Sequence, residues 1–356
     1  GSAVLKPQVG HASGIYTTDI STYVLGYLLG REWEPHAVYV TNQENQNSSF
    51  NGNFIAVHEA TPMEVWLGQM MDYTIQYETQ TYLCQHPVSF INWLTLDPMY
   101  HNSEFIESEK VKEYDNDLLV LDFRKFHATE LFDPGIFASY HVYPYYPDYI
   151  FLEDKYQNRT NYKGNKDNFL AYLEDLKSNI GSMPLVIAEY GLPSSRGVSH
   201  YTPFGFNQGG YNEIEQATYS ADLTYDIWQS NCAGGIFFEW IDEWFKHNWL
   251  VMDFEQPAER RVFWHNMENP EQNFGIMAVE SRIKTIDGRT DDWPDFPEQT
   301  RKPFVRAAAD ASYFYLLAYL PDVDLKKHKI FFAFDTYSKQ KGSHKLPFLS
   351  KKLSNG

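Results

Sequence analysis

The segment Pro184–Gly191 reads PLVIAEYG, and this short stretch does most to decide the fold. A continuous apolar run between a proline and a glycine is typical of a strand buried on both faces, as in a parallel sheet. Four further segments share this character: Tyr23–Gly30, Val88–Trp93, Phe137–Tyr143 and Gly234–Trp240. We therefore predict five strands in one sheet.

Amphipathic helices are predicted between these strands. Thr61-Pro62-Met63-Glu64 has the form of a capping box with proline at the first helical position, which starts a helix that runs to about Tyr82. Residues 167–179 and 213–229 have the same periodicity, whereas the polar insert from about 98 to 130 is expected to be a loop on the rim. This alternation is typical of repeated βα units around a parallel sheet.

Composition excludes several classes of partner. The 356 residues are 43% hydrophobic and can bury a large core, and 29 Lys+Arg against 47 Asp+Glu give a net charge of -18. Such a charge repels phosphate backbones and anionic lipid headgroups, so we expect no nucleic acid and no membrane insertion. Aromatic residues make up 17% of the chain, which suits a cleft that binds a neutral sugar.

The two cysteines indicate neither a metal site nor a disulfide. Cys84 and Cys232 lie far apart and lack a CxxC or a Cys/His partner spacing. We expect buried thiols. His11, Asp19 and Asp242 also lack metal-ligand spacing, and no glycine-rich phosphate loop is present, so no metal and no cofactor are expected.

The character of the chain changes after Trp240. Clear periodicity is lost, and Asp291–Pro297 resembles a linker, so we place a domain boundary near Thr300. Beyond it, Ala311–Leu317 and Lys329–Thr336 read as aromatic-rich strands. We expect residues 1–300 to form one α/β domain and residues 301–356 to be the beginning of a β-sandwich module.

Polar residues stand at the carboxyl ends of the predicted strands. In a parallel barrel, catalytic groups converge on this face. Glu32 and Glu189 are carboxylates on separate strand ends, and glycosidic hydrolysis requires one carboxyl group as proton donor and another as nucleophile or base. The residues at the strand ends are Glu32, Asn92, His141, Tyr143, Glu189 and Glu239 or Trp240.

Four of these segments carry a family resemblance. GREWEP (30–35), HVYP (141–144), AEYG (188–191) and GIFFEW (235–240) look like strands four, six, seven and eight of the clan A glycoside hydrolases, the barrel superfamily that includes β-galactosidases. Residues 10–280 also resemble a bacterial group of barrel proteins followed by a β-sandwich, marked by GHASG (10–14) and DEWF (242–245).

The resemblance implies a (β/α)8 TIM barrel and a retaining hydrolase acting on O-glycosyl bonds. Glu32 would be the acid/base and Glu189 the nucleophile. Only 31 residues precede Glu32, whereas three βα units need roughly 90, so the first barrel strands are expected to be missing. The expected substrate-binding residues are Asn92, His141, Tyr143, Trp240 and Glu243, and an extracellular or cell-surface protein is favoured.

One position leaves a second function open. Clan A enzymes usually have asparagine before the acid/base, whereas this chain has Arg31. A cation beside Glu32 would lower its pKa, which disfavours a general acid, although neighbouring residues of a strand point to opposite faces. Glu34 is a rival for the acid/base role. The alternative is a non-catalytic carbohydrate-binding barrel in a bacterial surface or polysaccharide-assembly protein.

Overall fold

The chain forms two compact units, Gly1–Ala278 and Val279–Gly356, which are described separately. The computed structural model describes residues 3–8, 13–101, 104–106, 109–111, 119–203, 205–255, 257, 266–277, 283–293, 302–310 and 313–332. Most of the GHASG motif, the end of the predicted linker and Thr300 lie outside these ranges. The observed division falls earlier in the chain than Thr300.

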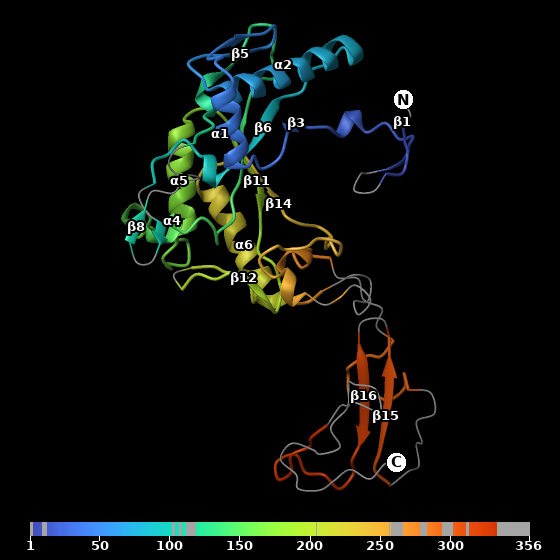
Figure 1. The fold of residues 1–356 in the computed structure, drawn as a ribbon. Helices are drawn as coiled ribbons and strands as arrows, with labels where there is room; N and C mark the ends of the chain where they lie inside the picture. The colour runs from blue at the N-terminus through green and yellow to red at the C-terminus, as the bar shows by residue number, and fades with distance from the viewer. Residues whose placement is uncertain are drawn as a thin grey trace. The chain divides into compact units, whose positions relative to one another are not determined.

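A five-stranded parallel sheet organises the first unit (Figure 1). Every neighbouring pair is parallel, and the order of strands across the sheet is their order in the chain. The strands are β3 (Tyr27–Leu29), β6 (Val88–Trp93), β10 (Ala138–His141), β11 (Leu185–Tyr190) and β14 (Gly234–Phe237).

These five strands confirm the five predicted apolar segments. They form a parallel half-barrel sheet with β3 and β14 at its edges within the described part of the chain. The described residues do not show a complete eight-stranded barrel. Because the strands are parallel, all five carboxyl ends lie at the same end of the sheet, here called its carboxyl edge.

Helices connect the strands where periodicity predicts them. The capping box is confirmed: Thr61 Oγ1 accepts the Glu64 N–H, and a Glu64 carboxylate oxygen accepts the Thr61 N–H. Helices α5 and α6 contact one another beside the strands (Figure 1). The helices are α1 (Pro35–Glu44), which was not predicted, α2 (Pro62–Tyr82), α4 (Tyr149–Leu152), α5 (Asn168–Ile180) and α6 (Glu213–Gln229). Short 3-10 turns cover Ser21–Tyr23, Leu94–Leu96, Phe123–Lys125, Asp154–Tyr156, Met252–Phe254 and Pro270–Gln272.

Small antiparallel sheets decorate the same unit. The insert after residue 98 is not a simple loop, since it contributes β7, β8 and β9. The pairs are β1 (Ala3–Leu5) with β2 (Gly14–Tyr16), β7 (Glu104–Ile106) with β8 (Glu109–Val111), and β12 (Val198–His200) with β13 (Gln208–Gly209); β4 (Phe50–Asn51), β5 (Ile55–Val57) and β9 (Phe126–Ala128) form a three-stranded sheet.

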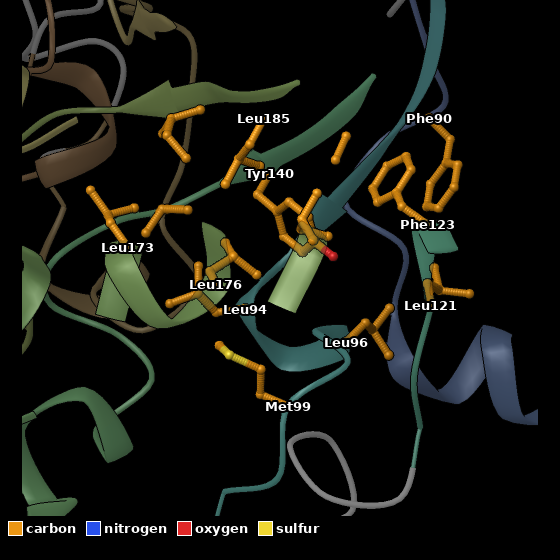
Figure 2. Close-up of a cluster of buried hydrophobic side chains, with 14 of the residues drawn as sticks. Phe90, Leu94, Leu96, Met99, Leu121, Phe123, Tyr140, Leu173, Leu176 and Leu185 are labelled. Carbon is orange, nitrogen blue, oxygen red and sulfur yellow. The ribbon is translucent and has the colours of Figure 1, made fainter. Parts of the chain in front are cut away.

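The hydrophobic core lies between the sheet and its helices. Figure 2 shows Tyr140 and Leu185 from neighbouring strands close to Leu173 and Leu176 from α5. Phe90 of β6 stacks on Phe123 with ring centroids 4.0 Å apart. The 98–130 insert therefore also supplies core side chains, and this core holds the strand ends in fixed positions.

Two expectations from composition have different outcomes. No helix in the described ranges is long and apolar enough to span a bilayer. The prediction of buried thiols is wrong: Cys84 is exposed and Cys232 is half-buried. Cys84 follows directly after the end of α2, where the chain turns over the surface.

The second unit contains an antiparallel hairpin of β15 (Phe304–Ala309) and β16 (Phe314–Tyr319). The predicted strand Ala311–Leu317 overlaps β16, whereas β15 was not predicted. Residues 329–332 form no strand, and 333–336 lie outside the described residues. An incomplete β-sandwich stays a prediction for this part of the chain.

Candidate active site

Glu189 and His141 face each other across two neighbouring strands. They lie near the carboxyl ends of β11 and β10, and the strand register pairs them directly. The backbone N–H of Val142 donates to the Glu189 carbonyl at 2.9 Å, which holds the two ends together. Gly191 then allows a close approach to β14, since a Cβ there would lie 2.2 Å from the Phe238 carbonyl oxygen.

Glu32 reaches the same edge from the loop after β3. Gly30 has φ +90°, and a Cβ on it would lie 2.2 Å from the Trp33 ring, so a glycine is required where the chain turns. The Trp93 indole N–H donates to the Trp33 carbonyl at 3.0 Å and fixes the loop to β6. These contacts turn Glu32 over the end of β6.

A histidine joins the two glutamates. His141 Nδ1 lies 3.0 Å from Glu32 Oε1 and 3.2 Å from Glu189 Oε2. The Tyr143 hydroxyl donates to Glu189 Oε2 at 2.8 Å. The His141 side chain is 7% exposed, but the carboxylates of Glu32 and Glu189 are 40% and 29% exposed. Both carboxylates are therefore accessible to a ligand, while the histidine that holds them is buried.

The surroundings of Glu189 shift its pKa upward. Burial raises its pKa above the ordinary value, His141 and the Tyr143 hydrogen bond oppose that shift, and the charge of Glu32 adds to it. Burial also raises the pKa of Tyr143 well above its ordinary value, so its hydroxyl stays protonated as a donor.

Arg31 does not contact the carboxylate of Glu32. Its Nη2 lies 3.6 Å from Glu34 Oε1, and its Nε donates to the Glu32 backbone carbonyl at 3.2 Å. The guanidinium is 70% exposed. Arg31, the residue that pointed to the non-catalytic alternative, is therefore paired with Glu34.

Further acidic groups surround this pair. Burial and the charge of Glu243 raise the pKa of Glu239 to about 7, and Glu189 contributes to the same shift. Burial also raises the pKa of Glu271, with contributions from Glu32 and Glu189. Lys246 pairs with Glu243 and lies 3.8 Å from Glu271 Oε2. The site is thus rich in carboxyl groups around one lysine.

Aromatic rings form the apolar wall of the site. Tyr143 stacks on Tyr145 at 5.3 Å and meets Phe274 edge-on at 5.9 Å. Phe238 and Phe274 contact each other at 5.1 Å, and Lys246 Nζ lies 4.7 Å from the Phe238 ring centroid. This packing fixes the Tyr143 hydroxyl that contacts Glu189.

The other predicted ligand-binding residues occupy different environments. Asn92 is fully buried, and its amide donates to the carbonyls of Leu121 and Leu96, so it is not brought to the carboxylates. The Trp240 side chain, just beyond β14, is 63% exposed. Glu243 pairs with Lys246 and influences Glu239.

Lys246 and Glu271 were missed at the level of sequence. The one sequence signal for Lys246 is its position directly after the charged segment that follows the strand ending at Phe237. Glu271 lies in a 3-10 turn, Pro270–Gln272, within a region without periodicity, so no pattern marks it.

The central trio also has a geometry that could hold a cation. One ligand atom from each of Glu32, His141 and Glu189 lies within 4.8 Å of the others. These are hard oxygen ligands and one imidazole, and the same groups are arranged for proton transfer. A second group of this kind within the described residues, Glu78, Cys84 and His86, lies at another place in the fold.

Comparisons with known proteins give a weak signal. No protein-family model and no curated protein sequence matches the chain. One solved structure, a β-glucuronidase from Faecalibacterium prausnitzii, is similar with a TM-score of 0.26 and 13% identity. The match covers 59% of this chain and 27% of that chain, so this protein spans about a quarter of its length.

Proposed function

We propose that this protein is a retaining glycoside hydrolase of the clan A type, built on a (β/α)8 barrel, with Glu189 as nucleophile and Glu32 as acid/base. One observation carries the proposal: His141 Nδ1 contacts a carboxylate oxygen of each glutamate, at 3.0 and 3.2 Å. Both carboxylates remain partly exposed at the carboxyl edge of a parallel sheet, which is where barrel enzymes place their catalytic groups.

The spacing of the two carboxylates supports retention of configuration. An oxygen of Glu32 and an oxygen of Glu189 lie within 4.8 Å of each other. Retaining enzymes have carboxyl groups about 5–5.5 Å apart, whereas inverting enzymes leave about 6.5–9.5 Å for a water molecule. This short oxygen–oxygen separation favours the retaining arrangement over the inverting one.

The reaction has two displacements. Glu189 attacks the anomeric carbon as the bond to the leaving oxygen breaks, and Glu32 gives its proton to that oxygen. Glu32 then takes a proton from water, whose oxygen attacks the anomeric carbon and releases Glu189 as a carboxylate. His141 positions both groups, and the Tyr143 hydroxyl holds the nucleophilic oxygen.

The charge around the site favours a neutral glycoside. Glu239, Glu243 and Glu271 lie near the pair, and Lys246 is the cation that contacts Glu243 and Glu271. Carboxylates stabilise the positive charge that develops on the sugar in the oxocarbenium-like transition state, but they repel an anionic substrate. Trp240, exposed beyond β14, is proposed as a platform for a sugar ring.

A covalent intermediate tests the proposal. The protein is incubated with a panel of dinitrophenyl glycosides, quenched in acid and digested, and its peptides are weighed by mass spectrometry. We expect a glycosyl adduct on Glu189, because an activated leaving group accelerates the first displacement relative to the second. If the protein binds oligosaccharides but shows neither an adduct nor hydrolysis, the non-catalytic carbohydrate-binding alternative is correct and the proposed catalysis is wrong.

A further inference from the structure

A second cluster of metal-ligating side chains lies at the amino ends of the sheet strands, opposite the carboxyl edge that carries the candidate active site. Glu78 is on the last turn of α2, and Cys84 and His86 are in the short loop that leads into the amino end of β6. Cys84 Sγ lies 3.7 Å from Glu78 Oε1, and His86 Nδ1 contacts the same oxygen. The three ligand atoms lie within 4.8 Å of one another.

The loop that carries Cys84 and His86 is held in place by its own hydrogen bonds. Leu83 ends α2 in the left-handed conformation, with φ 57°, and its N–H donates to the Thr79 carbonyl. Gln85 Nε2 donates to Thr79 Oγ1 at 3.2 Å and to the Leu131 carbonyl at 3.0 Å. The Gln85 side chain is thereby engaged elsewhere, while both of its neighbours contact Glu78.

The carboxylate of Glu78 is also fixed by outer contacts. The Tyr27 hydroxyl donates to Oε1 at 2.8 Å, and the His86 backbone N–H donates to Oε2 at 2.9 Å. Glu78 is 3% exposed, so its orientation is set by these partners. Hydrogen bonds of this kind orient the ligands of metal sites and raise their affinity.

We propose that Glu78, Cys84 and His86 bind a zinc ion, with water as the fourth ligand. Thiolate, imidazole and carboxylate are the three ligand types of zinc in proteins, and three protein ligands with an open position are a known arrangement. On a tetrahedral zinc with bonds of about 2.0–2.3 Å, ligand atoms are about 3.3–3.7 Å apart. The Cys84–Glu78 separation of 3.7 Å matches this spacing, and the Glu78–His86 contact would open as the ion enters.

The charges balance in this site. Cys84 gives up its thiol proton to solvent when it binds, and Glu78 contributes a second negative charge, so the two ligands neutralise Zn²⁺. His86 binds as neutral imidazole through Nδ1 and keeps its proton on Nε2. Cys84 is exposed, which leaves room for a water molecule on that side. The ion would fasten the end of α2 to the start of β6.

The test measures metal binding by the protein freed of metal. It is incubated with zinc chloride alone, desalted, and its zinc content is measured by elemental mass spectrometry. Cobalt chloride is used in parallel, because a thiolate bound to Co²⁺ gives a charge-transfer absorption band. We expect one equivalent of zinc, a cobalt–thiolate band and a higher melting temperature with zinc.

Single substitutions locate the ion. Cys84→Ser and His86→Ala should each weaken zinc binding by about 100-fold or more, since even an outer partner of a ligand is worth about 10–100-fold. Cys232→Ser removes the half-buried thiol that contacts Ser230 and should leave zinc binding unchanged. Glu189→Gln alters the other trio and should also leave it unchanged.

Each contrary result overturns the proposal. Loss of zinc in Cys84→Ser but not in His86→Ala would mean simple capture by an exposed thiol. Loss in Glu189→Gln would place the ion at the candidate active site. Zinc binding below one equivalent in the wild type, with no cobalt–thiolate band, would exclude the site. Cys84 is exposed, so Cys84→Ser removes no core contact, and circular dichroism checks its fold.

Discussion

In the part of the chain that the structure describes, a histidine held by two carboxylates occurs twice, once at the candidate active site and once in the core. In the core, His101 Nε2 lies 3.0 Å from Asp97 Oδ2, and its Nδ1 lies 3.6 Å from Glu153 Oε1. The ring stacks on Tyr149 with centroids 3.6 Å apart. The groups are the same as those around His141, but the surroundings differ.

Access to solvent separates the two clusters. The side chains of His101 and Asp97 are each 1% exposed, and the hydroxyls of Tyr149 and Tyr172 also donate to Asp97 Oδ2. At the active site, Glu32 is 40% exposed and keeps room for a ligand. A histidine with two carboxylates is thus no sign of catalysis by itself. We expect substitutions in the His101 cluster to affect stability and substitutions in the His141 cluster to affect turnover.

The largest effect should come from Glu189→Gln. The amide keeps the shape but cannot attack the anomeric carbon, so turnover of dinitrophenyl glycosides should fall by more than the ~10²–10⁴-fold that loss of a general acid costs. The melting temperature should not fall, because a partly buried carboxyl with a raised pKa is removed. If Glu189→Gln lowers stability but leaves the activity per folded molecule normal, the cluster has a structural role and no catalytic one.

Glu32→Gln should have an effect that depends on the leaving group. Glycosides with poor leaving groups need the proton and should react about 10²–10⁴-fold more slowly. Dinitrophenyl glycosides should form the Glu189 adduct at nearly the normal rate. Steady-state and burst kinetics with both substrates measure this contrast. An equal loss with both would argue against a general acid.

Asp97→Asn tests the buried cluster. It removes the charge that holds His101 and should cost about 3–5 kcal/mol of the free energy of unfolding, as when a buried ion pair is broken. Urea unfolding measures the loss. Asp175→Asn is a matched control, since this aspartate is 40% exposed and pairs with Lys155, and it should cost under about 1 kcal/mol. A loss of turnover per folded molecule in Asp97→Asn would break the comparison.

The pH dependence of stability should report His101. Burial alone would lower its pKa, but the hydrogen bonds and charges of Asp97 and Glu153 outweigh burial and raise it from 6.5 to about 9. The folded state therefore holds this proton more tightly than the unfolded chain. Its stabilisation is complete below pH 6.5 and is lost as the pH rises to about 9, by up to about 3 kcal/mol. In His101→Gln, unfolding followed over the same range should lack this loss.

The smallest effect is expected for Trp240→Ala. Loss of an aromatic platform should weaken oligosaccharide binding by about 1 kcal/mol, roughly fivefold. Stability should hold, because the Trp240 side chain is 63% exposed. Trp228→Ala on α6 is the control, with 69% exposure. Isothermal titration measures both, and equal binding by the two variants would remove Trp240 from the site.

Much of the sheet could be predicted from the sequence, because each of its strands is a short apolar run with turn residues at its ends. The helix from Pro62 was equally clear from its Thr61 capping box, and residues 167–179 and 213–229 were clear from their periodicity. Helix α1 was not predicted, because its sequence, PHAVYVTNQE, has little apolar periodicity and buries only Pro35 and Val38. β15 escaped because an alanine-rich segment gives weak strand signals.

The candidate site was predictable only as a set of strand ends. Parallel strands place Glu32, His141 and Glu189 on one edge, which the sequence indicates. The direction of each side chain is set by packing, and Asn92 shows the difference: it occupies a strand end, yet its amide bonds to backbone carbonyls. The sequence predicted no metal site at Cys84, because Glu78 comes close to Cys84 and His86 only after α2 has folded.

The order of strands in the sheet has a consequence for how the protein is made. Each strand from β6 to β14 pairs with the strand that precedes it in the sheet and in the chain. A nascent chain can therefore add strands one at a time as it leaves the ribosome, since β6 needs only β3 and β10 needs only β6. In every intermediate the strand added last has unpaired backbone groups along one side, which the next strand covers. A pause in translation after β10 would prolong the exposure of that edge and increase the demand for chaperones.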